Sequence, residues 1–143
     1  MSDFSDFLAE NKIKSENIKY AASKSFIDKA TGKPKEWELK TIDVALNEEL
    51  QKQCQRKVPI NGKSGRYQVQ LDENKYQALL VTNCVVYPDL NNKALQDSYG
   101  VMGAEDLVKA MLNVGEYADL AKQCLAINGF DVGLDELIDE AKN

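Results

Sequence analysis

The chain has 143 residues, of which 43% are hydrophobic and 29% are charged, as expected for one globular domain that needs no metal or disulfide to fold. It contains no histidine, which excludes a Ser–His or Cys–His nucleophile and removes the most frequent metal ligand. The formal net charge of −5 argues against a function dominated by phosphate binding, because nucleic-acid-binding proteins carry clustered basic residues.

Charge is distributed unevenly along the chain. Residues 1–71 carry a net charge of +3, whereas residues 72–143 carry a net charge of −8. We expect a single domain over residues 1–143, with a sheet-containing part at about 1–71 and a helical part at about 72–143. The acidic second part either recognises a basic partner or forms an ordinary solvated surface.

The cysteines and the N-terminus indicate a cytoplasmic protein. Cys54, Cys84 and Cys124 are too far apart in sequence for a close metal-binding pair, and an odd number does not suit a secreted disulfide framework. Cys84 and Cys124 fall on apolar helical faces, so we expect them in the core. The first six residues are acidic and polar, unlike a signal peptide, and no apolar run is long enough to span a membrane.

The first forty residues predict a short helix followed by two strands. Residues 3–11 place their apolar side chains on one helical face. Apolar and polar residues alternate over 18–26, and again around Trp37 and Leu39, which predicts two half-buried strands. The sequence Thr-Gly-Lys-Pro at 31–34 would form the loop between them, giving a hairpin.

The next segment predicts two capped helices separated by a loop and a strand. We expect the helices at 43–57 and 72–87, each beginning at an aspartate that can act as an N-cap. The irregular residues 58–65 predict a loop, and strict alternation over 66–71 predicts a third strand. Pro88 would end the second helix.

The remainder predicts helices joined at glycines. The expected helices span residues 93–99, 104–112, 116–128 and 134–142, and the junctions contain Gly100, Gly103, Gly115, Gly129 and Gly133. We therefore predict an α+β fold, with a small antiparallel sheet of about three strands in the N-terminal half and a helical C-terminal half.

No motif indicates catalysis, a metal or a cofactor. Gly62-Lys63-Ser64 resembles the end of a phosphate-binding loop, but position 57, where that motif requires glycine, is a lysine, so we expect a surface loop. Neighbouring carboxylates such as Glu105 and Asp106 do not face each other on a helix and suit its first turn. We predict no catalytic residue, no metal ligand and no cofactor.

Two segments are candidates for binding a partner. The first is the connector, residues 87–104, whose candidate side chains are Tyr87, Leu90, Tyr99, Val101 and Met102. Aromatic and methionine side chains are frequent at protein interfaces, but these would equally fill the joint between the two parts of the fold. The second is the last predicted helix, which either packs on its own domain or presents Leu134, Leu137 and Ile138 to another chain.

A series of short segments gives the chain a specific family resemblance. The most specific are Val-Tyr-Pro-Asp-Leu at 86–90 and Leu-Gln-Asp-Ser-Tyr-Gly-Val-Met-Gly-Ala at 95–104. With these segments in this order, the chain resembles the XkdN-like phage tail assembly chaperones over almost its whole length. The other matching segments lie at 1–4, 7–8, 19–26, 37–40, 58–59, 74–76, 115–117 and 127–130.

The resemblance implies a protein made while a long-tailed phage or phage-like prophage element assembles its tail. Such a protein would bind the tape measure protein, help tail tube subunits polymerise around it and be absent from the finished tail. In some related phages a longer, frameshifted form contacts the tail tube protein; this chain ends at Lys142-Asn143 without that extension. We expect no nucleic-acid or membrane partner, and self-association is left open.

The alternative is a structural virion protein, such as a tail completion or head–tail joining subunit. That protein would be present in purified particles, whereas a chaperone would be absent from them. An enzyme or nucleic-acid-binding protein is disfavoured by the missing histidines and the acidic charge balance.

Overall fold

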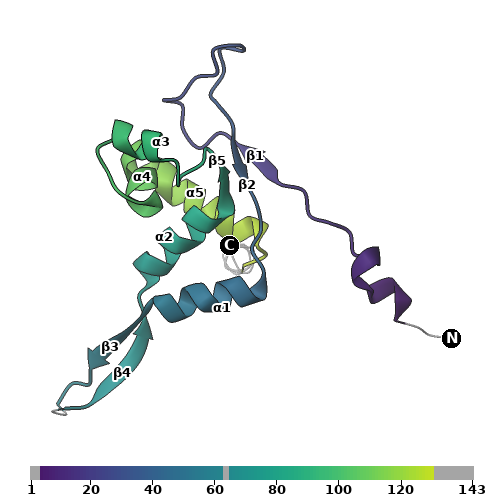
Figure 1. Cartoon of the computed structure of the whole chain (residues 1–143). Coiled ribbons are helices and arrows are strands. Elements are labelled where there is room, and N and C mark those ends of the chain that lie inside the picture. Colours follow the sequence, from purple (N-terminus) through teal and green to yellow (C-terminus); the bar gives the residue numbers. More distant parts are fainter. Residues whose placement is uncertain (1–3, 63–64, 131–143) are drawn as a thin grey trace, which may run out of the picture.

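The structure, a computed structural model, describes residues 4–62 and 65–130. The strands in these residues are Ile18–Tyr20 (β1), Trp37–Leu39 (β2), Gln55–Pro59 (β3), Tyr67–Leu71 (β4) and Val85–Tyr87 (β5). The helices in these residues are Val44–Gln53 (α1), Glu73–Cys84 (α2), Lys93–Ser98 (α3), Ala104–Met111 (α4) and Val114–Ile127 (α5). The predicted α+β class is confirmed, with antiparallel sheets and with most helices in the second half (Figure 1).

The central sheet has the order β1-β2-β5. The predicted hairpin is confirmed, because β1 and β2 pair antiparallel with Tyr20 opposite Trp37. The first strand is shorter than predicted and ends at Tyr20. The prediction that α2 continues to Tyr87 is wrong: α2 ends at Cys84, and β5 pairs antiparallel with β2. Valine and tyrosine favour extended backbone, and here the open edge of β2 gives them a pairing partner.

A second sheet consists of β3 and β4 alone. The predicted strand at 66–71 is confirmed as β4, but the predicted helix end at residue 57 is wrong, because α1 ends at Gln53 and Gln55 begins β3. Residues 58 and 59 therefore belong to a strand rather than to the predicted loop. Hydrogen-bonded pairing with β4, from Gln55–Leu71 to Pro59–Tyr67, overrides the local helical preference of this segment.

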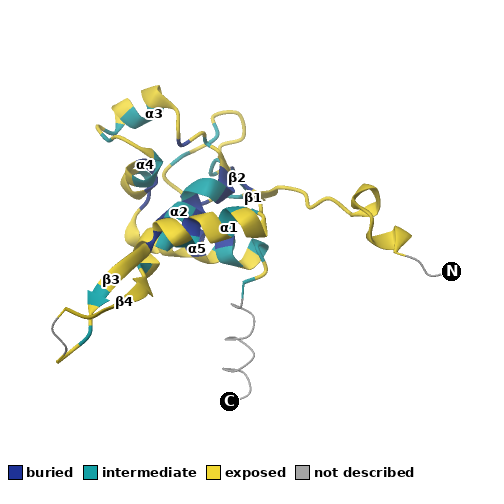
Figure 2. Cartoon of the chain, turned by 60° about the horizontal axis from the view of Figure 1, so that its bottom comes forward, coloured by how far each residue is buried: buried dark blue, intermediate teal, exposed yellow. Residues whose placement is uncertain are grey.

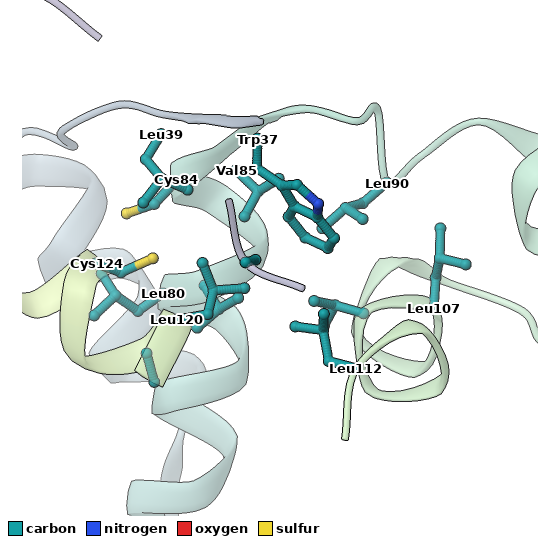
Figure 3. Close-up of a cluster of buried hydrophobic side chains, with 14 residues drawn as sticks. Trp37, Leu39, Leu80, Cys84, Val85, Leu90, Leu107, Leu112, Leu120 and Cys124 are labelled. Atoms are coloured by element: carbon teal, nitrogen blue, oxygen red, sulfur yellow. The ribbon is translucent and has the colours of Figure 1, made fainter. Parts of the chain in front are cut away.

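The core lies where the central sheet meets α2, α4 and α5 (Figure 3). The largest fully buried side chains in this cluster are Trp37 and Leu39 from β2, Leu80, Val81 and Cys84 from α2, Leu107 and Val108 from α4, and Leu120 and Cys124 from α5. The prediction that Cys84 and Cys124 are core residues is confirmed. Each fully buried leucine stabilises the fold by roughly 1.5–3 kcal/mol relative to an exposed one.

The helix starts follow the capping signals of the sequence. Asp43 Oδ1 accepts a hydrogen bond from the Leu46 N–H at 2.8 Å, and Asp72 Oδ1 accepts one from the Lys75 N–H at 3.2 Å. Both predicted N-caps are confirmed. The predicted helices at 93–99, 104–112 and 116–128 correspond to α3, α4 and α5, whereas the predicted helix at 134–142 lies outside the described residues.

The N-terminal segment differs from its prediction. In place of an α-helix it forms two single turns of 3₁₀-helix, Ser5–Phe7 and Ala9–Asn11. Figure 1 shows this arm extending away from the rest of the fold, so no packing stabilises a longer helix. None of the helices in residues 4–62 and 65–130 is long and apolar enough to cross a membrane.

Candidate partner-binding surface

The connector leaves β5 at Tyr87 and is held in a defined shape by side-chain hydrogen bonds. Asn92 Oδ1 accepts from the Leu95 N–H at 2.9 Å and caps α3. Gln96 Nε2 donates to the Leu90 carbonyl at 2.9 Å, and Gln96 Oε1 accepts from the Gly103 N–H at 3.0 Å. One side chain therefore joins the two ends of the segment.

The connector residues divide into two groups. Leu90 is only 2% exposed, and Tyr99 and Val101 are half-buried against the core. Tyr87 and Met102 are 47% and 88% exposed. The first group fills the joint between the sheet and the helices, and the second group is available to a partner. The other candidates, Leu134, Leu137 and Ile138, lie outside the described residues.

A groove of about 670 Å³ lies beside Tyr87, between the central sheet and the loop that joins β1 to β2. Lys35 Nζ lies 6.0 Å from the centroid of the Tyr87 ring and 3.6 Å from Asp28 Oδ2. The N–H of Ala30 and the ammonium of Lys35 lower the pKa of Asp28. The groove thus offers an aromatic face beside fixed charges, which suits an amphipathic peptide.

A second hollow, of about 360 Å³, lies beside Met102. Its lining includes Leu79 from α2 and two carboxylates, Glu105 and Asp106, in the first turn of α4. The positive end of the helix dipole favours carboxylates at this position, as the sequence predicted. This hollow therefore combines exposed apolar surface with negative charge.

Two exposed apolar segments were not identified as surfaces from the sequence. The β3–β4 hairpin projects from the body, and all five residues of β4 are exposed, although apolar and polar residues alternate along this strand. In the N-terminal arm, Phe4, Phe7 and Ile13 are exposed. A sequence signal for the hairpin did exist, because residues 55–71 contain four basic residues and no acidic one.

The described part of the chain contains no cluster of metal-ligating side chains, and its cysteines are buried. No group of three or more Cys, Asp or Glu side chains that could hold a metal ion occurs in residues 4–62 and 65–130. The three thiols are free and buried. Contact with the Cys84 thiol and burial raise the pKa of Cys124, and burial raises that of Cys54, which disfavours a thiolate at either position.

Comparison with known families gives these surfaces a context. The family model described as phage XkdN-like tail assembly chaperone protein matches residues 4–142. The chain belongs to this family. It is therefore a phage tail assembly chaperone, and its partners are expected among phage tail proteins.

Two relatives and a solved structure are similar to the chain along most of its length. The chaperone is 34% identical to the phage-like element PBSX protein XkdN of Bacillus subtilis strain 168, over 99% of this chain and 94% of that protein. It is 32% identical to the protein YqbN of the same strain, over 99% and 93% of the two chains. A crystal structure of YqbN matches with a TM-score of 0.75 and 28% identity, covering 92% of this chain and 99% of the other.

Proposed function

We propose that this chaperone binds the tape measure protein of its own phage element, without catalysing a reaction, and assists assembly of the tail tube around it. The observation that carries the proposal is the family match over residues 4–142, on a fold that exposes apolar side chains at the connector. In this proposal the chaperone acts in the host cytoplasm and is absent from the finished tail. A longer, frameshifted form would add contacts to the tail tube protein.

A physical need supports this role. A tape measure protein is a long, helix-rich chain that cannot bury its apolar stripe before the tube surrounds it. Side chains such as Tyr87 and Met102 can cover parts of such a stripe, and methionine adapts to varied apolar partners. The net charge of −8 over residues 72–143 would keep the resulting complex soluble. Each contact should be weak enough for incoming tube subunits to displace it.

The experiment that tests this function is co-expression with the tape measure protein of the same element, followed by solubility and pull-down measurements. We expect the tape measure protein to be soluble only with the chaperone and to co-purify with several copies of it. If the tape measure protein stays insoluble and unbound with both the short and any longer form, the proposal fails. Detection of the chain in purified particles would instead support a structural virion protein.

The connector is tested by a matched pair of substitutions. Met102→Asp places a charge at an exposed apolar position of the connector, and Val114→Asp does the same on α5, where Val114 is equally exposed. We expect Met102→Asp to weaken tape-measure binding by about 5- to 30-fold, as for an interface residue worth about 1–2 kcal/mol. We expect Val114→Asp to bind as the unmodified chain does. Equal effects of the two changes would count against the connector.

The last predicted helix is tested separately. Charge reversal of its carboxylates, Asp135, Glu136, Asp139 and Glu140, should weaken binding if the acidic C-terminal half supplies part of the surface. Binding that is unchanged by this reversal would remove that segment from the proposed interface.

A further inference from the structure

The β3–β4 hairpin carries an apolar face that the rest of the described chain does not cover. Side chains two apart on a strand share a face, so Tyr67, Val69 and Leu71 lie together, and all three are exposed. Lys57 pairs with Val69 in the register and therefore belongs to the same face. Figure 2 shows the hairpin exposed along almost its whole length.

The hairpin also carries a charge opposite to that of the rest of the molecule. Residues 55–71 contain Arg56, Lys57, Lys63 and Arg66 and no acidic residue, which gives +4 in a chain of net −5. The remaining residues therefore carry −9. Among the described residues, the ion pairs are Lys35–Asp28 and Lys93–Asp97, so the hairpin cations in that part of the chain are left without a carboxylate partner.

The surface that complements the hairpin lies elsewhere in the same chain. The hollow beside Met102 combines that methionine, which is almost fully exposed, with the carboxylates of Glu105 and Asp106. Each surface combines exposed apolar side chains with charged ones, and the charges of the two surfaces have opposite signs. In Figures 1 and 2 the hairpin points away from α4, so one molecule does not bring the two surfaces together.

We propose that the β3–β4 hairpin of one molecule docks on the acidic hollow of a second copy of this chain. A single such contact between two molecules leaves one hairpin and one hollow free. The two molecules can also pair these if each docks its hairpin on the hollow of the other. This inference does not depend on the proposed tape-measure binding, because it concerns the isolated chain. Because the hollow includes Met102, self-association would compete with the proposed tape-measure contact, but it is measured without that partner, so the two proposals can still fail separately.

The test is sedimentation equilibrium of the full chain with charge-reversed variants. The hairpin variant is Arg56→Glu with Lys57→Glu and Arg66→Glu, which changes the hairpin charge from +4 to −2. The hollow variant is Glu105→Lys with Asp106→Lys. We expect the unmodified chain to associate, with a dissociation constant that rises at least about fivefold between roughly 50 and 500 mM salt. Each variant alone should be at least about tenfold weaker in association, because its two surfaces then carry the same sign.

Restored association distinguishes this contact from a general effect of charge. An equimolar mixture of the two variants makes both contacts complementary again, so it should recover the association of the unmodified chain. A chain that carries all five substitutions should also recover it. Circular dichroism of each variant checks that the fold is intact.

Three results would overturn the proposal. The first is an unmodified chain that stays monomeric up to several hundred micromolar. The second is a mixture of folded variants that fails to associate. The third is binding of DNA or RNA that is lost in the hairpin variant while self-association is unaffected, since the basic hairpin would then serve phosphate binding.

Discussion

Asn128, the C-cap residue directly after α5, joins three parts of the fold through one side chain. Its Nδ2 donates to the Cys124 carbonyl at 2.7 Å and to Cys84 Sγ at 3.3 Å. Its Oδ1 accepts from the Ile42 N–H at 2.8 Å. The amide thus ties α5 to α2 and to the segment that leads into α1, at a half-buried position where water cannot fully replace these bonds.

The first prediction concerns this amide. Asn128→Ala removes the acceptor of the Ile42 N–H and should lower the free energy of unfolding by about 1–3 kcal/mol. Asn91→Ala, at an exposed asparagine of the connector, should change it by less than about 0.5 kcal/mol. Urea denaturation followed by circular dichroism measures both. Equal losses would show that the three-way connection adds nothing to stability.

The second prediction concerns core packing on α5. Leu120 is fully buried in the same cluster as Trp37 and Leu80. Leu120→Ala should therefore lower the free energy of unfolding by about 2–5 kcal/mol through lost burial and the cavity left behind. Val114→Ala on the same helix removes methyl groups from an exposed position and should change the free energy of unfolding by less than about 0.5 kcal/mol. The same denaturation experiment compares them, and a loss below about 1 kcal/mol for Leu120→Ala would contradict the core described above.

Among the helices that the structure describes, α5 has the most complete start signal. Asn113 Oδ1 accepts from the Glu116 N–H at 2.8 Å, and Glu116 Oε1 accepts from the Asn113 N–H at 3.0 Å, which forms a capping box. The N–H of Asn113, with a smaller contribution from the Ser23 hydroxyl, lowers the pKa of Glu116. The carboxylate form of Glu116 is therefore the form that stabilises the helix start.

The third prediction follows from this lowered pKa. A carboxyl group with a lowered folded-state pKa stabilises the fold above its ordinary pKa of 4.5, and this contribution is lost as the pH falls through the lowered value. Glu116→Gln keeps a hydrogen-bonding side chain but removes the titration. The midpoint temperature of thermal unfolding should therefore fall less steeply from pH 7 to pH 3 for Glu116→Gln than for the unmodified chain. Identical pH profiles of the two midpoint temperatures would contradict the prediction.

The elements also show what local sequence can and cannot predict. The caps at Asp43 and Asp72 and the alternation of β4 are signals within a few residues, and the structure confirms each of them. The strand β5 depends on β2, a partner far away in sequence, and Val85–Tyr87 continues the apolar pattern of α2, so no local feature separates strand from helix there. The strand β3 was missed for the same reason, because its pairing with β4 is tertiary information.

Across the whole molecule, the core and the exposed surfaces are spatially separate. The buried cluster gathers the central sheet with α2, α4 and α5, whereas the β3–β4 hairpin and the N-terminal arm lie outside it (Figure 1). Alternation in β4 could predict a strand but not its exposure, because burial depends on whether another element covers the face. For the connector, the composition predicted that its apolar side chains contribute either to a partner surface or to the joint of the fold. Only the structure shows that Leu90 is buried and Met102 is exposed.

The fourth prediction is a difference in hydrogen exchange between these parts. Hydrogen bonds of β3 and β4 are exposed to solvent and supported by little packing, so their amides should exchange at least about tenfold faster than those around Leu80, Leu107 and Leu120. Mass spectrometry at a concentration where the chain is monomeric measures this difference. Equal protection would show that the hairpin unfolds together with the core.

The two hydrogen bonds of Gln96 have a consequence for recognition. Because this side chain closes the connector from Leu90 to Gly103, the loop is ordered before any partner arrives. Binding through Met102 then requires little further loss of chain entropy, and a surface of modest area can still reach a useful affinity. Gln96→Ala should therefore weaken binding at Met102 through a larger entropic penalty at nearly unchanged enthalpy, which calorimetry would separate from the loss of a direct contact.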